Sequence, residues 1–564
     1  MSFFLKSGNA MYWKSDMEHI ELDNVRLFSR ALDVREASGM LAAYCGGTLA
    51  SYLNALDTPV FLAVIIDESD DSVLIVNDKF GSNQLFYAVR DGVLYASDDV
   101  TSLFAAWQDA PRIKAASAYE LLELYTVCPP RTLFEGVSAV PMASILHCRG
   151  IETRLEPYWN VREVLASKTR DYESLVGEFR DSFIKSLKRG YKKGETGVAL
   201  SGGLDSGGAL AVLTHIAAEP IPSLSYGPHG KTSGDLVGAR ASAKESGSPQ
   251  TFLYPSLVDL ARLPDMMRGL SQPFTVDVLF PNAMLFEQAR TMGIKRLVFG
   301  YGSEMLLGNL AMAKYADSVR RVERLLPRFL SRALFSVYAR YKKLSQNQLE
   351  FLMADSWGRR FLQVRAPLFT RNKRVYARLP RDFSDLFIYE LDALVQDLPL
   401  NDAIVRMYLT TWENYLQWHD VGSLARRYGI ECVMPFDTPA VAETLFHAPL
   451  EFRRLMGWDK KMIRDMFKPF ITERLYHAKG KSLVVPYTEF LAPVRNDLLE
   501  YLATSTLITD LVDINLYRQS YGSLPEPGLH LARLFGLAVW YDVNWNTENL
   551  PNLKRIIAVL QSSK

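Results

Sequence analysis

A glycine- and serine-rich loop in the middle of the chain has the residue types that bind phosphate. The string Ser201-Gly202-Gly203-Leu204-Asp205-Ser206 follows an apolar run at 198–200 and precedes an apolar, helix-like stretch at 209–218. A strand that leads through such a loop into a helix presents backbone N–H groups at the helix N-terminus, where anions bind. The glycines let the main chain approach a phosphate closely, and the serines supply hydroxyl donors. The sequence therefore predicts a nucleotide-phosphate site.

Two acidic residues indicate that a metal ion accompanies the phosphates. A carboxylate beside a phosphate is repulsive unless a divalent cation lies between them, so Asp205 points to a bound cation. In a second loop, Gly300-Tyr301-Gly302-Ser303-Glu304, a strand-like run again ends in glycines followed by an acid. Asp205 and Glu304, facing one triphosphate, would share Mg²⁺ and assist the departure of pyrophosphate. The nucleotide contacts expected from the two loops and the neighbouring strand ends are Leu200, Ser201, Gly202, Gly203, Leu204, Asp205, Ser206, Ser225, Tyr226, Gly300 and Gly302.

The elements that must position these loops differ between the two parts of the chain. Short β-rich runs at 59–66, 73–76, 85–89 and 93–96, with a hairpin signal at Asp91-Gly92, predict a β-dominated first domain that continues to about residue 165. Strand-like runs at 197–200, 223–226, 251–254 and 296–299 are separated by helix-length segments. That alternation is typical of a parallel α/β sheet, in which ligands bind at the C-terminal ends of the strands.

The rest of the chain, from about residue 310, is mainly helical by periodicity, as in the segment 401–412. The arginine-rich region between Arg320 and Arg381 is interpreted as solvated helix faces or a mobile segment rather than as a nucleic-acid patch.

Composition narrows the class of protein. A chain of 564 residues with 48 % hydrophobic and 23 % charged residues is typical of a globular protein with more than one domain. The formal net charge of +1 gives no electrostatic reason to expect nucleic acid or membrane as a partner.

No apolar run approaches the ~18 residues of a spanning helix, and no secretory signal is visible at the N-terminus. The four scattered cysteines, Cys45, Cys128, Cys148 and Cys432, favour reduced thiols, and the predicted location is cytoplasmic.

Several strings together resemble those of a known family. The loop at 201–206 is similar to the pyrophosphate-binding loop of the ATP pyrophosphatases, and with the loop at 300–304 it resembles the asparagine synthetase superfamily. The strings at 77–88, 94–98, 429–437 and 461–464 extend the resemblance over most of the chain. It implies an α/β fold: an N-terminal Ntn-hydrolase-like, β-rich αββα domain at 1–165, and a C-terminal adenine-nucleotide α-hydrolase-like parallel α/β domain with a helical extension at 166–564.

The first domain departs from the pattern that the resemblance implies for a glutaminase. The family's nucleophile is an N-terminal cysteine exposed by removal of Met, whereas this chain has Ser2. The Arg-Gly-Pro-Asp and Asn-Gly-Glu strings that build the family's glutamine pocket are also missing. We therefore expect a glutaminase fold without glutaminase activity, and an amine that comes from the substrate itself.

Family branches without the cysteine include β-lactam synthetases, carbapenam synthetases and lasso-peptide cyclases. Tyr301 stands where β-lactam and carbapenam synthetases have a tyrosine that pairs with a downstream carboxylate to deprotonate the substrate amine, and Glu413 and Asp420 are the two candidate partners. The resemblance also implies a cationic lysine that stabilises negative charge, here Lys479 or Lys481. Glu304 stands where the family usually has an aspartate, so the metal geometry is expected to shift.

These observations predict a ligase that uses ATP and Mg²⁺ to adenylate a substrate carboxylate and then closes an intramolecular amide, as β-lactam synthetases do in antibiotic biosynthesis. The expected substrate is a small amino-carboxylate or a peptide. The alternatives are a lasso-peptide macrocyclase, an ammonia-dependent synthetase, and a catalytically silent ATP-binding homologue.

Overall fold

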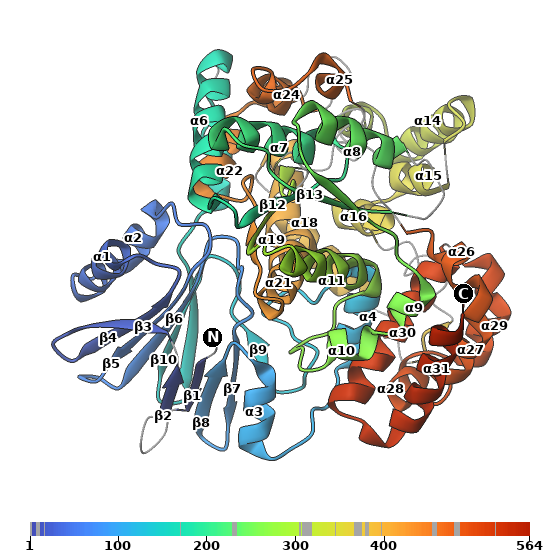
Figure 1. The fold of residues 1–564 in the computed structure, drawn as a ribbon, viewed down its shortest axis with the longest axis horizontal. Coiled ribbons are helices and arrows are strands. Elements are labelled where there is room, and N and C mark those ends of the chain that lie inside the picture. Colours follow the sequence, from blue (N-terminus) through green and yellow to red (C-terminus); the bar gives the residue numbers. More distant parts are fainter. Residues whose placement is uncertain are drawn as a thin grey trace.

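A computed structural model describes residues 3–6, 12–15, 17–169, 171–227, 234–303, 306, 319–344, 346–365, 375–377, 383–395, 398–453, 460–478, 485–524 and 526–563. It contains a β-rich N-terminal domain, a parallel α/β domain and a large set of further helices (Figure 1). No helix in these ranges is both long and apolar enough to cross a membrane.

Two antiparallel sheets face each other in the N-terminal domain. One has the order β2-β1-β8-β7-β9 and the other the order β11-β10-β6-β5-β4-β3. Apolar residues of both inner faces, among them Leu5, Val64 and Leu94, form a separate core between the sheets. The strands are β1 (Phe3–Lys6), β2 (Tyr12–Ser15), β3 (Glu18–Leu22), β4 (Val25–Arg30), β5 (Leu62–Asp67), β6 (Ser72–Asn77), β7 (Phe86–Arg90), β8 (Val93–Ser97), β9 (Ser138–Ala139), β10 (Ser144–Arg149) and β11 (Glu152–Pro157).

Helices complete an αββα arrangement. Figure 1 shows α1 (Val34–Cys45) and α2 (Leu49–Ala55) outside one sheet, and α3 (Val100–Trp107) on the side of the other. Helix α1 begins with a capping box, in which Asp33 and Glu36 each accept a hydrogen bond from the other's backbone N–H. Because strand β5 is covered on both faces, it is apolar along most of its length instead of alternating. Helices α4 (Ala115–Leu124) and α5 (Val161–Ala166) finish this part of the chain.

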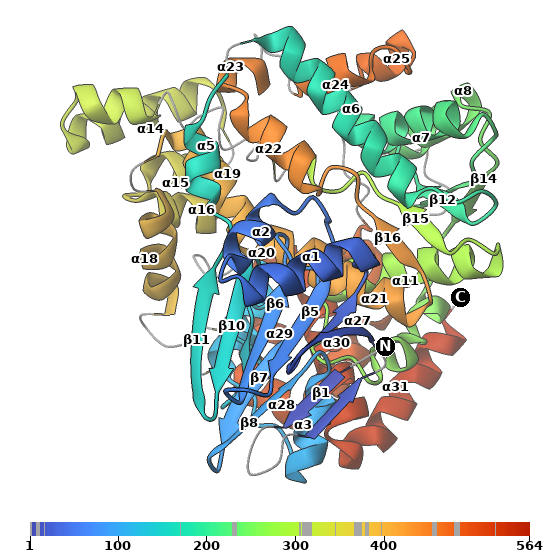
Figure 2. The ribbon, with the colours of Figure 1, turned by 90° about the vertical axis from the view of Figure 1, so that its left-hand side faces the viewer.

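The second domain is built on a parallel sheet with the strand order β14-β13-β12-β15-β16. Helices α7 and α8 lie over one face and α11 over the other, as Figures 1 and 2 both show. The order reverses between β12 and β15, and such a switch point leaves a crevice at the carboxyl ends of the strands. The elements are α6 (Tyr172–Gly190), β12 (Thr196–Ala199), α7 (Leu204–Ala217), β13 (Ser223–Tyr226), α8 (Gly234–Glu245), β14 (Gln250–Leu253), α9 (Leu257–Leu260), α10 (Leu263–Met267), α11 (Val276–Thr291), β15 (Arg296–Val298) and β16 (Glu431–Val433).

Helices make up most of the remaining chain. The long helix α30 (Pro527–Asn544) is almost entirely buried, and the indole of its Trp540 donates to the carbonyl of Leu270, 2.9 Å away. The other helices of the described chain are α14 (Arg328–Tyr341), α15 (Gln346–Met353), α16 (Trp357–Arg365), α18 (Phe383–Val395), α19 (Leu400–Thr410), α20 (Trp412–Tyr415), the π-helix η2 (Leu416–Gly422), α21 (Ser423–Arg427), α22 (Pro439–His447), α23 (Leu450–Arg453), α24 (Lys461–Phe467), α25 (Glu473–Tyr476), α26 (Tyr487–Leu491), α27 (Arg495–Leu502), α28 (Thr506–Leu511), α29 (Ile514–Ser520) and α31 (Leu550–Ser562), with three short 3₁₀-helices, η3 (Ala492–Val494), η4 (Tyr521–Ser523) and η5 (Thr547–Asn549).

The fold class expected from the sequence is confirmed, and each strand-like run named in either domain corresponds to a strand within a few residues. The predicted hairpin is also present, since Asp91 and Gly92 have φ values of 53° and 75° between β7 and β8. Strands β1 to β4, β9 to β11 and β16 have no counterpart among those runs. All four cysteines are free.

Candidate functional site

The glycine–serine loop lies at the carboxyl end of β12 and leads directly into α7. Gly202 has a φ of 82°, a left-handed conformation that L side chains rarely adopt, and Gly203 caps the helix. The Ser206 hydroxyl accepts a hydrogen bond from the backbone nitrogen of Ser201 at 3.1 Å and lies 2.9 Å from the Ser201 hydroxyl. The loop therefore curls over the first turn of α7. The hydroxyls of Ser201 and Ser206 lie there beside the backbone N–H groups of the helix N-terminus.

The second loop meets the first across the switch point. A Cβ at Gly300 would lie 2.7 Å from the backbone nitrogen of Ser206, so only glycine allows this approach. Gly302 has a φ of 96°, and a Cβ there would overlap the Oδ1 atom of Asp437. A close backbone approach thus explains Gly300, and left-handed backbone conformations explain Gly202 and Gly302. The two predicted nucleotide loops adjoin at Gly300.

Lys460 is the functional candidate that sequence reasoning missed. Its ammonium group donates to Oδ2 of Asp205 at 2.5 Å and to the Ser303 hydroxyl at 3.0 Å, so it bridges the two loops. Lys460 stands at the start of α24 with a left-handed φ of 62°. Its spacing of four residues from Arg464 is the signal that could have singled it out.

Two further glycines let α24 and α25 approach the phosphate-loop helix. A Cβ at Gly208 would overlap the ring of Phe467 on α24, and one at Gly207 would lie 2.9 Å from a methyl group of Leu475 on α25. The absence of side chains on this face of α7 therefore sets the depth at which α24, and with it Lys460, can lie.

Strand β13 supports the first loop from the side. The Ser225 hydroxyl donates to the carbonyl of Leu200 at 2.7 Å and accepts from Gln250 at 3.1 Å, so Ser225 holds the main chain of the loop. Tyr226 is half-buried, and burial raises the pKa of its phenol, which the nearby Tyr301 raises further. These two predicted contacts lie beside the loops, with Ser225 in a supporting role.

Tyr301 is held in the second loop by its neighbours. Its ring stacks on Phe299 with centroids 5.1 Å apart and planes 10° from parallel. Burial raises the pKa of Tyr301 to about 12, although the side chain of Asn282 acts in the opposite direction. The phenol therefore carries its proton at neutral pH, and a role as a base needs a partner or a nearby cation.

Asp420 lies on the π-helix η2, a form of helix that is frequent at functional sites. Burial raises the pKa of its carboxyl well above the usual value, and Oδ1 accepts from the hydroxyl of Thr126 at 3.5 Å. No hydrogen bond joins Asp420 to Tyr301 among the described residues, so the structure does not bring these two candidates into direct contact. Glu413 lies on α20, and its side chain is not among those described.

Glu304, Lys479 and Lys481 lie outside the described residues. The chain that leads to the two lysines is held by Arg464, which donates to the carbonyls of Tyr476 and Ala478, the latter at 2.9 Å. Arg464 therefore anchors the residue immediately before Lys479 to the helix that begins beside Lys460.

The chemistry of Asp205 fits a cation. One carboxylate oxygen is paired with Lys460, whereas Oδ1 is buried and has no hydrogen-bond partner among the residues that the structure describes. A buried carboxylate oxygen without a donor is costly unless a ligand completes it, and a hard divalent cation would do so. No cluster of three or more acidic, histidine or cysteine side chains occurs in the described part of the chain. Asp205 is thus the one predicted metal ligand whose surroundings are described.

The N-terminal domain has its own group of charges near the start of the chain. Both oxygens of Asp98 are taken, one by the backbone nitrogen of Phe3 at 2.8 Å and the other by Arg30 at 2.7 Å. Asp98 and Arg30 border a cavity of 990 Å³ between the domains, which extends to Trp418 and Met434. Ser2 lies outside the described residues.

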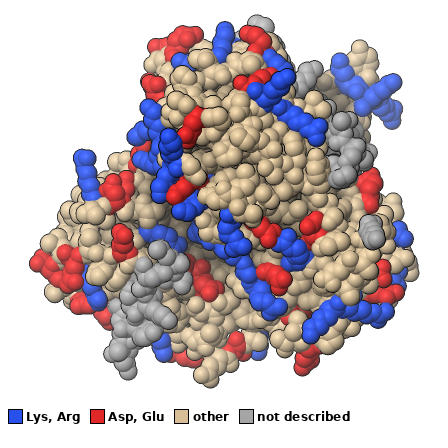
Figure 3. Space-filling model, viewed as in Figure 1, with Lys and Arg blue, Asp and Glu red and all other residues tan. Residues whose placement is uncertain are grey.

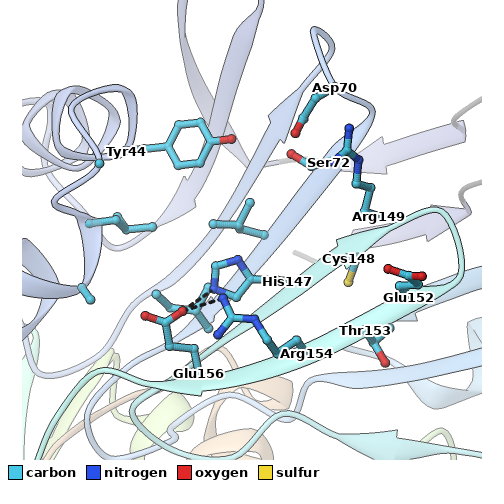
Figure 4. Close-up of a pocket in the computed structure, with 15 residues that line it drawn as sticks. Tyr44, Asp70, Ser72, His147, Cys148, Arg149, Glu152, Thr153, Arg154 and Glu156 are labelled. Carbon is cyan, nitrogen blue, oxygen red and sulfur yellow. Dashed lines mark hydrogen bonds and ion pairs between the residues drawn. The ribbon is translucent and has the colours of Figure 1, made fainter.

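A second cavity, of 930 Å³, opens on the outer face of the N-terminal domain beside α1 and α2. Figure 4 shows that His147 and Arg154 both reach Glu156, at 3.0 and 2.8 Å. Burial, followed by the nearby Arg154, lowers the pKa of His147. These three charges are paired with one another, and no described residue of either predicted nucleotide loop lines this cavity.

The asparagine synthase family matches residues 178–526, and the glutamine amidotransferase domain matches residues 40–159. Amidase chry2 of Gibberella zeae is 21 % identical over 474 residues, which cover 76 % of this chain and 69 % of that protein.

Two solved structures overlap the fold loosely. The U34-tRNA thiolase NcsA from Methanococcus maripaludis is 15 % identical, covers 44 % of this chain and 80 % of its own, and has a TM-score of 0.21. The glutamine phosphoribosylpyrophosphate amidotransferase from B. subtilis is 9 % identical, covers 50 % of this chain and 62 % of its own, and has a TM-score of 0.17.

Proposed function

The chain belongs to the asparagine synthase family of ATP-dependent, amide-forming ligases, and we propose that it closes an amide within one substrate molecule, in the manner of β-lactam synthetases. The observation that carries the proposal is the junction of the two loops, in which Lys460 links Asp205 to Ser303 beside the curled segment 201–206. We place the domain boundary at residue 165, near the end of α5 and before α6.

The first loop is suited to hold the phosphates of ATP. Backbone N–H groups at the start of α7, together with the hydroxyls of Ser201 and Ser206, form donors for phosphate oxygens. Lys460 adds a positive charge at the same place. We assign Leu200, Leu204, Tyr226, Gly300 and Gly302 to the walls of this site.

Asp205 and Glu304 would hold Mg²⁺. When bound, Mg²⁺ would offset the negative charge of the triphosphate and of the departing pyrophosphate. The buried, unpartnered oxygen of Asp205 supports its part in this assignment.

The reaction proposed has two steps. An oxygen of the substrate carboxylate attacks the α-phosphorus of ATP, the bond from that phosphorus to the bridging oxygen breaks, and pyrophosphate leaves. The substrate amine then attacks the acyl carbon of the mixed anhydride, and AMP leaves with the electrons of the carbon–oxygen bond. Because both groups belong to one molecule, the second step benefits from a high effective concentration.

The amine must lose a proton as the amide forms. We assign Tyr301, which follows Gly300 in the second loop, to relay that proton to Glu413 or Asp420 as its acidic partner. Lys479 or Lys481 would stabilise the negative charge that develops on phosphate and on the carbonyl oxygen. Arg464 would fix the approach of these lysines by its two hydrogen bonds to the chain before them.

The amine source proposed is the substrate and not glutamine. This chain has Ser2 in place of the family's N-terminal cysteine, and it lacks the Arg-Gly-Pro-Asp and Asn-Gly-Glu strings of the family's glutamine pocket. The N-terminal domain therefore acts as a structural partner of the ligase domain.

The test is to incubate the purified protein with ATP, Mg²⁺ and a panel of amino-carboxylates, and to follow ATP–pyrophosphate exchange and AMP release. The expected result is exchange and AMP release without glutamine or ammonium, lost in the Asp205→Asn variant. Product formation that requires added ammonium would identify an ammonia-using synthetase, and dependence on a processed peptide would identify a macrocyclase. Tight ATP binding with no turnover would contradict the proposal.

A further inference from the structure

The helix α14 and the segment before it present apolar side chains to solvent. Seven of the fifteen exposed large hydrophobic residues in the described part of the chain lie between residues 325 and 341. They are Leu325, Phe329, Leu330, Leu334, Val337, Tyr338 and Tyr341. Isolated exposed apolar residues are ordinary, but a contiguous group of this kind marks an interaction surface.

The exposed residues share one face of α14. At about 100° per residue, the positions from Phe329 to Tyr341 cover roughly half of the helix circumference. The opposite face carries Ser331, Phe335 and Ala339, which are buried against the rest of the molecule. Figures 1 and 2 show α14 standing out from the body of the protein, and the residues named above are the exposed ones of this helix and the segment before it.

The same segment is strongly basic. Residues 319–343 contain eight Lys or Arg and one acidic residue, which gives this stretch a net charge of +7 and leaves −6 for the rest of the chain. Figure 3 shows the blue side chains gathered around this protrusion at the upper right. The charge balance of the whole chain, +1, therefore conceals a concentrated positive patch.

The ion pairs in the described part of the chain leave several of these charges without an acidic partner. In the described part of the chain, Arg328 pairs with Asp355, whereas no carboxylate lies within ion-pair distance of Arg324, Arg340 or Lys343. An exposed apolar face flanked by uncompensated cations is the pattern of a helix that lies in the interface of an anionic membrane.

We propose that α14 docks this protein reversibly onto anionic lipid bilayers, with its apolar face among the headgroups and its arginines and lysines on lipid phosphates. A second copy of the chain is disfavoured as the occupant, because two segments of +7 would be brought together. A protein groove is disfavoured because the apolar arc is about as wide as half a helix, while groove-binding helices use a narrower row of anchors. The proposal is independent of the ligase chemistry.

The experiment is vesicle flotation with the full-length protein. Vesicles of phosphatidylcholine alone are compared with vesicles that also contain phosphatidylglycerol. The expected result is binding to the anionic vesicles only, reduced at least about tenfold when NaCl is raised from about 0.05 M to about 0.5 M, because salt screens the charge term. Equal binding to both kinds of vesicle, or to neither, overturns the proposal.

Matched variants test the apolar face. The double substitution Val337→Ser and Tyr341→Ser is expected to weaken binding at least about tenfold. Tyr389→Ser is the control, because Tyr389 and Tyr341 are each 78 % exposed, and it is expected to bind within about twofold of the unmodified protein. Equal binding of the double variant and the control contradicts the assignment of α14, as does a dimer in solution that the double variant abolishes.

Discussion

The ammonium group of Lys460 lies 2.5 Å from the carboxylate of Asp205, although 255 residues separate them in the chain. The pair joins the helix that follows β12 to the start of α24 and reaches Ser303 in the second loop. Lys460 thus offsets the negative charge of Asp205 at the point where the two loops meet.

The first prediction concerns this lysine. Lys460→Met should lower kcat/KM for ATP by about a hundredfold, because a preorganised charge beside the phosphates is lost. Lys460→Arg keeps the charge and should retain more activity than Lys460→Met. Steady-state kinetics of AMP release checks this, with Lys468→Met, a lysine just beyond the end of α24, as the control. Unchanged ATP kinetics in Lys460→Met would remove Lys460 from the phosphate site.

The second prediction concerns the approach of α24 to α7. Gly208→Ala places a methyl group against the ring of Phe467 and should destabilise the fold by about 2 kcal/mol, since this contact has no spare room. Gly177→Ala is the matched control, because Gly177 is also helical and nothing lies within 4 Å of its added Cβ. That substitution should stabilise by about 0.5–1 kcal/mol. Urea unfolding of both variants measures the change in the free energy of unfolding. No change in Gly208→Ala would refute the claim that α24 packs closely on Gly208.

The third prediction separates the two chemical steps. Tyr301→Phe should leave ATP–pyrophosphate exchange within severalfold of the unmodified rate and lower amide formation by about a hundredfold or more, because only the second step moves the amine proton. Glu413→Gln and Asp420→Asn are measured beside it, and the variant that shows the same split identifies the partner of Tyr301. Loss of exchange in Tyr301→Phe would instead assign the phenol to nucleotide binding.

The fourth prediction follows from the burial of Asp437. Burial raises the pKa of this fully enclosed carboxyl to about 8, so the folded chain keeps a proton that the unfolded chain releases above about pH 4. The contribution of Asp437 to stability is complete below the unfolded pKa and is lost as pH rises through the folded pKa.

Asp437→Asn, which mimics the protonated group, removes this dependence. The free energy of unfolding of the unmodified protein, relative to Asp437→Asn, should fall by about 1.4 kcal/mol per pH unit between about pH 5 and about pH 7.5. Urea unfolding at several pH values measures it. Parallel pH profiles for the two proteins would show that Asp437 does not titrate in this range.

Much of the architecture could be predicted from short-range patterns. The sequence segments of β5, β6, β12 and β15 are apolar stretches bounded by turn residues. Such strands can be predicted from the sequence because burial on both faces makes them continuously apolar. Strand β3, by contrast, has the sequence EHIEL and is largely exposed, so burial leaves little pattern in it. This strand forms because it pairs with β4, and the sequence of β3 alone does not indicate that pairing.

The site was predictable only in part for the same reason. The loop at 201–206 contains its own signal, whereas Lys460 becomes relevant only when α24 packs on a helix face that lacks side chains at Gly207 and Gly208. The sequence also gives no signal for the π-helical turn that contains Asp420, because this turn interrupts a segment that is otherwise α-helical.

The contact between the two domains gives the N-terminal domain a structural role that does not depend on any chemistry of its own. Asn414 donates to the carbonyl of Phe80 at 2.6 Å, and the Tyr415 hydroxyl accepts from the backbone of Met142 at 3.0 Å, immediately before the π-helical turn. Loops of the N-terminal domain thus fix the position of the helix from which the turn with Asp420 begins. Phe80 and Met142 therefore hold the start of the π-helical turn in place, so a chain without the N-terminal domain would lose two of the hydrogen bonds that fix the backbone next to Asp420.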